Sequence, residues 1–205
     1  MRSHRKWLSG WTTALVLLFS VVELATDAFA QYYGKLVRNI TALHQREDGN
    51  GDFLIGHCNG NCEPDLYFIK RRNTDTKSIE VHCLDGASNF QKFIVHTGTP
   101  LAQREDGNGD FRMCMSSRGT FYPAVLFFIK RRNTDTKSIE VHSLFGPDFQ
   151  KFRVQTGTQI PQSEDGNGDF QMGLYDGPAN VFFIKRRNTD SKMIEVHILR
   201  SSWTK

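Results

Sequence analysis

Three copies of one sequence unit run through this chain and constrain its fold more than any other feature. The block Glu-Asp-Gly-Asn-Gly-Asp-Phe stands at 47–53, 105–111 and 164–170. Two further blocks follow it each time, Phe-Ile-Lys-Arg-Arg-Asn-Thr-Asp at 68–75, 128–135 and 183–190, and Ile-Glu-Val-His at 79–82, 139–142 and 194–197. Self-similarity at a nearly fixed period is typical of repeat architectures. The sequence therefore predicts three repeats, at 47–104, 105–163 and 164–205.

Each repeat has the pattern of four short strands. In the first repeat the predicted strands are 52–56, 66–71, 78–84 and 90–96, with a turn at 73–76. Alternation of apolar and polar residues in 78–84 is typical of a strand that is buried on one face. Four sequential antiparallel strands form a meander, which is the unit of a propeller blade.

The third repeat ends after its third strand, and the missing strand has a counterpart at the other end of the chain. When the sequence is shifted by 58 residues, Tyr32 falls on Phe90 and Val37 on Val95. Residues 31–46 are therefore predicted to be an orphan fourth strand that closes the last repeat. The predicted class is all-β, with three four-stranded blade-like repeats that form a partial propeller or are completed by a second copy into six blades. A β-trefoil-like closure is the alternative.

The first repeat also resembles a known calcium-binding repeat. The segment His-Cys-Asn-Gly-Asn-Cys-Glu-Pro-Asp-Leu at 57–66 is similar to the calcium loop of FG-GAP or VCBS repeats, in which Asp65 and Leu66 match the pattern Asp-x-Asp-x-Asp-Gly-x-x-Asp-Leu. The acidic positions of that pattern are occupied here by His57, Asn59 and Asn61. The resemblance implies a propeller of the integrin or fungal-lectin kind, with degenerate calcium loops.

A second candidate for calcium is the Gly-rich block itself. Oxygen-bearing side chains at alternate positions suit a hard cation. The candidate ligands are Asp48, Asn50, Asp52, Asp106, Asn108, Asp110, Asp165, Asn167 and Asp169. We favour a turn in which these side chains bond the backbone, and keep calcium as the alternative.

Basic residues recur with the same period. The net charge is +4, which is too weak to indicate a nucleic-acid partner. On a ring, three basic runs would concentrate charge along one rim and bind an anionic ligand. These runs are Lys70, Arg71, Arg72, Lys130, Arg131, Arg132, Lys185, Arg186 and Arg187. The alternative, which we favour, is a solvated hairpin stem in which Glu80 pairs with Arg71.

Histidine and cysteine give further candidate ligands. His82, His142 and His197 recur after a valine, and we expect them to be outward and solvated rather than metal-binding. Cysteines stand at positions 58, 62, 83 and 114. Four cysteines allow three pairings, and Cys58 could pair with Cys62 and Cys83 with Cys114. We favour disulfides or free thiols, and a zinc site formed by His57, Cys58, Cys62 and Cys83 is the alternative.

Residues 1–30 have the pattern of a secretory signal peptide. A basic start and an apolar run precede Ala28-Phe29-Ala30, a small-x-small cleavage site. Glu23 and Asp27 shorten the apolar run, which disfavours a membrane anchor. The chain is therefore expected to be extracellular, and the sequon at Asn39 is a candidate for glycosylation.

The pattern of variation points to binding. The chain has no Gly-x-Ser-x-Gly, His-Glu-x-x-His or phosphate-loop motif. The repeats differ most between their two conserved blocks, at the cysteine loop, at 116–123 and at 175–180. Variable loops on a repeated scaffold carry specificity. We expect a non-catalytic, lectin-like module for glycans or another surface ligand, with a structural or matrix protein and an enzyme accessory domain as alternatives.

Overall fold

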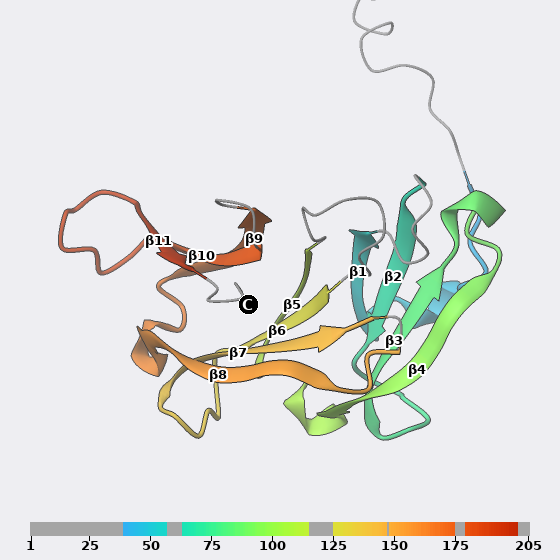
Figure 1. The fold of residues 1–205 in the computed structure, drawn as a ribbon, viewed down its shortest axis with the longest axis horizontal. Helices are drawn as coiled ribbons and strands as arrows, with labels where there is room; N and C mark the ends of the chain where they lie inside the picture. The colour runs from blue at the N-terminus through green and yellow to red at the C-terminus, as the bar shows by residue number, and fades with distance from the viewer. Residues whose placement is uncertain (1–38, 57–62, 115–124, 147, 175–178, 201–205) are drawn as a thin grey trace, which may run out of the picture. The chain divides into compact units, whose positions relative to one another are not determined.

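Three antiparallel sheets follow one another along the chain in a computed structural model that describes residues 39–56, 63–114, 125–146, 148–174 and 179–200 (Figure 1). The first sheet comprises β1 Gly51–Gly56, β2 Asp65–Lys70, β3 Ser78–Leu84 and β4 Phe93–Ala102. The second comprises β5 Gly109–Cys114, β6 Val125–Lys130, β7 Ser138–Phe145 and β8 Phe152–Pro161. The third comprises β9 Gly168–Leu174, β10 Ala179–Lys185 and β11 Glu195–Leu199.

The predicted meander is confirmed. Each strand pairs with the next in the chain, in the orders β1-β2-β3-β4, β5-β6-β7-β8 and β9-β10-β11. The described strands do not close into a barrel, so the trefoil-like closure is not formed. Residues 40–205 form one compact unit, and no described helix is long and apolar enough to span a membrane.

The fourth strand begins later than the sequence pattern predicts. It starts at Phe93 rather than Phe90 and continues to Ala102. Asn89 and Phe90 have φ of 55° and 64°, in the left-handed region, and residues 86–88 form a 3-10 helix. Backbone in that conformation cannot continue a strand, so the pairing begins only after it.

Successive sheets pack face to face. We call the face that carries Phe68 and its equivalents the front face, and the face that carries Ile69 and its equivalents the back face. Tyr67, Ile69 and Val81 on the back of the first sheet form one core with Phe111 and Phe128 on the front of the second. A second core joins the back of the second sheet, with Phe127, Ile129 and Val141, to the front of the third, with Phe170 and Phe183. The second sheet therefore lies between the first and the third.

Each outer face of this array exposes some apolar side chains, although Phe68 on the front of the first sheet is 0% exposed. On the front of the first sheet Phe53 is 49% exposed, whereas its equivalent Phe111 is 1% exposed. On the back of the third sheet Ile194 is 67% and Val196 60% exposed. The equivalents of these two residues in the first sheet, Ile79 and Val81, are both 0% exposed. Side chains that form the core at the two inner junctions are thus left uncovered at both ends.

The third sheet has three strands, as the sequence indicates, and β11 is its edge. The described part of the predicted orphan strand, residues 39–46, contains no strand, and Gln45–Glu47 form a 3-10 helix. Residues 31–38 of that segment lie outside the described residues. The same 3-10 turn precedes the Gly-rich block in the other repeats, at Gln103–Glu105 and Gln162–Glu164.

Candidate functional site

Arginines of the first repeat contact an aspartate of the second. Arg72 Nε lies 2.5 Å from Asp106 Oδ2, and Arg71 Nη1 lies 3.1 Å from Asp106 Oδ1. Arg71 also reaches Asp52 of its own repeat, with 3.3 Å between Nη2 and Oδ1. The Asp106 side chain is mostly shielded from solvent, so two arginines act on it where screening is weakened, and Arg72 also donates a hydrogen bond to it. The basic run and the Gly-rich block, considered separately in the sequence, therefore form one contact between repeats.

The second junction repeats this geometry. Arg132 Nε lies 2.6 Å from Asp165 Oδ2, and Arg131 Nη1 lies 3.1 Å from Asp165 Oδ1. Sequence reasoning missed this contact, although a signal was present. Because the basic run and the acidic block recur with one period, any contact between neighbouring repeats must be made at both junctions.

Two neutral hydrogen bonds accompany each ion pair. Thr74 Oγ1 donates to Gln103 Oε1 at 3.0 Å. The backbone N–H of Gln103 donates to the backbone carbonyl of Lys77, also at 3.0 Å. At the second junction Thr134 Oγ1 donates to Gln162 Oε1 at 2.7 Å, and the Gln162 amide to the Lys137 carbonyl at 3.0 Å. These bonds lie within the preceding repeat and fix the turn that leads to Asp106 or Asp165, while the arginine–aspartate ion pairs cross the junction.

Each end of the array carries one half of this set. Asp48, equivalent to Asp106 and Asp165, is exposed at the first repeat. Arg186 and Arg187 are exposed at the third, and the ion pair that Arg186 makes among the described residues is with Asp169 of its own repeat, at 3.0 Å. Within the described residues no ion pair involves Asp48 or Arg187. The two ends therefore carry opposite charges at matching positions.

The Gly-rich blocks are tied internally by the amides and acids that were considered for calcium. Asn50 Nδ2 donates to Glu47 Oε2 at 3.1 Å, and Asn50 Oδ1 accepts from Asn73 Nδ2 at 2.8 Å. The two other blocks have the same bonds, at Asn108 with Asn133 and Asn167 with Asn188. Asp52 and its equivalents Asp110 and Asp169 face Arg71, Arg131 and Arg186. These side chains hold a turn to a hairpin, and calcium binding stays a prediction.

The lysines of the basic runs are paired within their own repeats. Lys70 lies 3.3 Å from Glu47, Lys130 3.2 Å from Glu105 and Lys185 3.0 Å from Glu164. Their side chains are mostly buried, whereas Arg72, Arg132 and Arg187 are exposed. Arg72 and Arg132 are paired with Asp106 and Asp165, so Arg187 is the one of these three arginines without an ion pair among the described residues, and an anionic ligand stays a prediction.

A glutamate and a histidine recur in the third strand of each repeat, and they are buried in the first two. Glu80 Oε2 lies 3.1 Å from His82 Nε2, and Glu80 Oε1 accepts from the amide and hydroxyl of Thr76 at 3.0 and 2.9 Å. The His82 ring packs between Phe68 and Phe93, with ring centroids 5.7 and 6.1 Å away. The expected solvated histidine and the expected Glu80–Arg71 pair are both wrong here, because the fourth strand covers the ring and Thr76 and His82 take the carboxylate.

The third repeat shows what the fourth strand contributes. His197 contacts Phe183 at 5.8 Å and Glu195 at 3.0 Å, as its equivalents do, but its side chain is 44% exposed. In the second repeat Phe152 on the fourth strand lies 5.7 Å from His142, which is buried. The outward position expected from the sequence is therefore found only where the described sheet lacks its fourth strand.

These groups titrate abnormally for physical reasons. Burial lowers the pKa of His82 and His142, and the hydrogen bonds from Glu80 and Glu140 oppose the shift only in part. Burial raises the pKa of Glu80, but hydrogen bonds from Thr76 and His82 outweigh it and leave that pKa lowered. The exposed Glu195 has its pKa lowered to about 2 by the Ser191 hydroxyl, His197 and the Ser191 amide. Both partners of each buried pair thus favour a neutral imidazole beside a carboxylate.

One group of side chains in the described residues has the spacing of metal ligands. Ligand atoms of Glu80, His82 and His96 lie within 4.8 Å of one another. His96 is peculiar to the first repeat, since Gln155 takes its place opposite His142. The Glu-His pair recurs in all three repeats, with or without a third ligand, so its shared role is structural.

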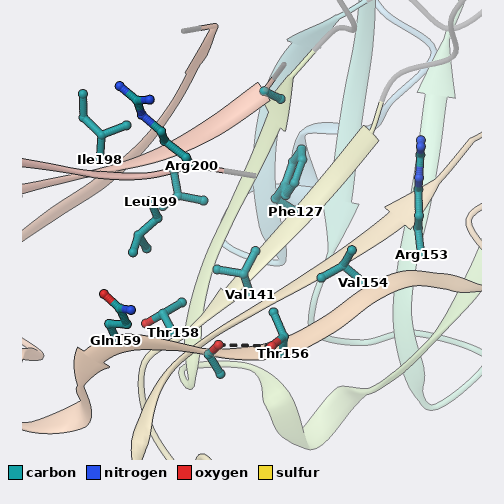
Figure 2. A pocket seen from close by; sticks show the side chains of 13 residues that line it. Phe127, Val141, Arg153, Val154, Thr156, Thr158, Gln159, Ile198, Leu199 and Arg200 are labelled. Atoms are coloured by element: carbon teal, nitrogen blue, oxygen red, sulfur yellow. Dashed lines mark hydrogen bonds between the residues drawn. The ribbon is translucent and has the colours of Figure 1, made fainter. Parts of the chain in front are cut away.

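A cavity of about 760 Å³ lies between the second and third sheets (Figure 2). Figure 2 shows Val141, Val154 and Thr158 below the cavity, with Leu199 above them pointing toward Thr158. The full lining is Phe127, Val141, Arg153, Val154, Thr156, Gly157, Thr158, Gln159, Ala179, Val181, Ile198, Leu199 and Arg200. Most of this lining belongs to the back of the second sheet and to β11.

The same position is filled at the first junction. The residues equivalent to Phe127, Val141 and Val154 are Tyr67, Val81 and Val95, which belong to the first core. Phe149 is fully buried in that core, and its ring packs edge-on against Tyr67 at 6.3 Å. Phe149 comes from the segment that leads into the fourth strand of the second repeat. The cavity therefore lies at the second junction in the position that corresponds to this part of the first core.

The disulfide predicted between Cys83 and Cys114 is wrong. Cys83 is buried in the first core, and Cys114 packs against the second, with no disulfide between them. The two cores lie on opposite faces of the second sheet, which separates the sulfur atoms. Burial raises the pKa of the Cys114 thiol. Cys58 and Cys62 lie outside the described residues.

No protein-family model, curated protein or solved structure matches the chain. Fold and contacts nevertheless define its class, an all-β protein of tandem antiparallel sheets joined by recurring Arg–Asp contacts.

Proposed function

We propose that the chain is a non-catalytic, lectin-like binding module of the extracellular space, and that it works as an end-to-end assembly of two copies with six sheets. The observation that carries the assembly is the recurrence of one junction. The same contact joins Arg72 to Asp106 and Arg132 to Asp165. Arg187 and Asp48 hold the equivalent positions at the two ends and make no ion pair with another described residue.

The apolar faces support the same assembly. Phe53 and Ile55 are exposed at one end, and Ile194 and Val196 at the other. At both inner junctions the equivalent faces pack against each other and exclude water. Contiguous exposed apolar surface with a charged rim is typical of an interaction site. Joining the ends of two copies would bury these side chains and match the charges in a single geometry.

A non-catalytic role is supported by the repetition of the titratable groups. Glu80 and Glu140 make the same bonds to threonine and histidine, and Lys70 and Lys130 to glutamate. Catalysis normally needs one arrangement of unlike groups. The segments that differ between repeats connect β1 to β2, β5 to β6 and β9 to β10, so the scaffold presents three different sequences for a glycan or another surface ligand.

The solution mass of the chain from Gln31 tests the assembly. We expect twice the monomer mass, and a monomer at micromolar concentration would overturn the assembly. Asp48→Lys should give a monomer, whereas Asp75→Lys, in an exposed turn away from the ends, should remain a dimer. Adding Arg186→Asp and Arg187→Asp to Asp48→Lys should restore the dimer, because the charges are then exchanged rather than lost.

A glycan array, with and without a chelator, tests the ligand. Binding that is abolished by changes at 116–123 but not by changes at the conserved turn 133–136 would support the variable connections. Failure to bind any glycan, together with growth into large particles, would favour the structural or matrix alternative.

A further inference from the structure

We infer that the first repeat holds a zinc site formed by Glu80, His82 and His96. The inference goes beyond the proposed function and does not depend on it, because all three side chains belong to the first sheet of one chain. The site is also separate from the Gly-rich blocks that were considered for calcium, whose amides and acids hold the turns of those blocks.

The three side chains lie on one face of two neighbouring strands, β3 and β4 (Figure 1). His82 is directly opposite His96, and Glu80 stands two residues before His82, so all three project from the front face. Their ligand atoms lie within 4.8 Å of one another. His82 Nε2 and Glu80 Oε2 are 3.1 Å apart, close to the roughly 3.3 Å that separates two ligands of one tetrahedral zinc ion. An ion between these two atoms would replace the proton that they now share.

The Glu80 carboxylate is held in a way that leaves one oxygen for the ion. The amide and hydroxyl of Thr76 donate to Glu80 Oε1 at 3.0 and 2.9 Å, so Oε2 is the oxygen that faces His82. Hydrogen bonds of this kind orient the ligands of a metal site and raise its affinity. Glu80 and His82 are 3% and 6% exposed, so these two ligands are fixed before any ion binds.

His96 is the ligand that can adjust its position. Its side chain is exposed, and the centroid of its ring lies 4.1 Å from that of His82. A small rotation of this exposed ring therefore brings a nitrogen to an ion held by the two buried ligands. Three protein ligands leave one position of a tetrahedral zinc ion open, and water takes it from the exposed side. Two imidazoles and one carboxylate favour zinc over calcium, which takes six to eight oxygen ligands.

The second repeat separates the structural pair from the metal ligand. Glu140 and His142 make the same 3.1 Å contact, and Thr136 makes the same bonds to Glu140, but Gln155 lies opposite His142. The sheet therefore forms with the Glu–His pair alone, and His96 adds a ligand that this structural role does not require. Gln155 is exposed although the first sheet packs on the front of the second, so His96 would stay accessible in the proposed assembly as well.

Metal titration of the untagged chain tests the inference, with Zn²⁺ followed by calorimetry and Co²⁺ by visible absorption. We expect one ion per chain at this site, without a thiolate charge-transfer band for Co²⁺, and no displacement by excess Ca²⁺. His96→Gln reproduces the second repeat and should keep the fold. Loss of a residue that only orients a ligand typically costs about 10–100-fold in affinity, so His96→Gln should weaken Zn²⁺ binding at least about a hundredfold. Unchanged Zn²⁺ binding by His96→Gln would overturn the inference.

A gain of binding in the second repeat tests the ligand set directly. Gln155→His should add a second ion per chain, because it completes the equivalent pair of Glu140 and His142. Combined with His96→Gln, it should restore a single ion. If neither chain gains an ion, a histidine opposite the Glu–His pair is not sufficient, and the three-ligand set is wrong.

The cysteine loop is the competing location for zinc. Cys58→Ser with Cys62→Ser should leave the Zn²⁺ affinity of the described site unchanged. If that variant loses Zn²⁺ while His96→Gln keeps it, the ion is bound at the cysteine loop and the inference is wrong. A chain that binds no Zn²⁺ would reject the metal site and leave the proposed assembly intact, since the solution mass measures the assembly independently.

Discussion

Arg72 and Asp106, from neighbouring repeats, lie 2.5 Å apart, and their equivalents Arg132 and Asp165 lie 2.6 Å apart. Each aspartate also receives a second arginine at 3.1 Å. The repeats are therefore joined by ion pairs as well as by their apolar cores. Removal of one Arg–Asp contact should destabilise both of the sheets that it joins.

Asp106→Asn tests this coupling. Exposed ion pairs contribute about 0–1 kcal/mol, and this carboxylate is more shielded and has two partners, so we expect a loss of roughly 1–2 kcal/mol in the free energy of unfolding. Urea unfolding followed by fluorescence measures it. Asp75→Asn, an exposed acid in a turn, is the control and should change stability by less than about 0.5 kcal/mol. Equal effects of the two substitutions would contradict a role for the junction.

The filling of the first core gives a second prediction. Phe149→Ala should lower the free energy of unfolding by roughly 3–5 kcal/mol, because it opens a cavity beside Tyr67 like the one seen at the second junction. Phe90→Ala, at the equivalent but less buried position of the first repeat, should cost clearly less. Thermal and urea unfolding compare the two, and a larger loss for Phe90→Ala would be inconsistent with the packing described.

Substitution of two glycines in the second Gly-rich block distinguishes the energetic cost of a left-handed backbone from the cost of steric crowding. Gly107 has φ of +83° and open space around it, so Gly107→Ala should cost about 1–2 kcal/mol from left-handed backbone strain alone. At Gly109 an added Cβ would lie 2.1 Å from the Ile129 carbonyl oxygen, in the β5–β6 pair. Gly109→Ala should therefore cost roughly 3 kcal/mol or more. The reverse order of unfolding midpoints would show that the close strand approach is relieved at low cost.

The buried histidines predict sensitivity to acid. Because burial lowers the pKa of His82 and His142, the unfolded chain takes up protons at these positions below about pH 6.5 while the folded chain does not. The free energy of unfolding should thus fall as the pH drops from 7 toward the folded-state pKa. The lowered pKa of Glu80 and Glu140 adds stability above about pH 4.5 that is lost at still lower pH.

Urea unfolding at pH 7 and pH 5.5 measures this dependence. The double substitution His82→Gln and His142→Gln should reduce the difference in unfolding free energy between the two pH values. His197→Gln, at the exposed equivalent, should keep the difference. An unchanged difference in the double variant would place the acid sensitivity elsewhere.

The repeat and the meander could be predicted from the sequence because both depend on local order. The alternation of apolar and polar residues in 78–84 and the turn residues after Arg72 indicate the strands and the hairpin of one repeat. Because the same sequence recurs, the same elements are predicted in all three repeats. The three described strands of the third repeat could be predicted for the same reason. The start of β4 could not, because it depends on the left-handed backbone at Asn89 and Phe90, which the pattern of apolar residues does not report.

Contacts between repeats were decided only by the tertiary structure. The sequence shows that Asp106 and Arg72 recur, but not that they meet, since pairing depends on how one sheet packs on the next. Pairing with the fourth strand buries His82 beside Phe93, and the packing of successive sheets places Cys83 and Cys114 in different cores. A local pattern specifies a strand, whereas the burial of a side chain depends on what covers it, and in this protein that cover comes from a neighbouring strand or sheet.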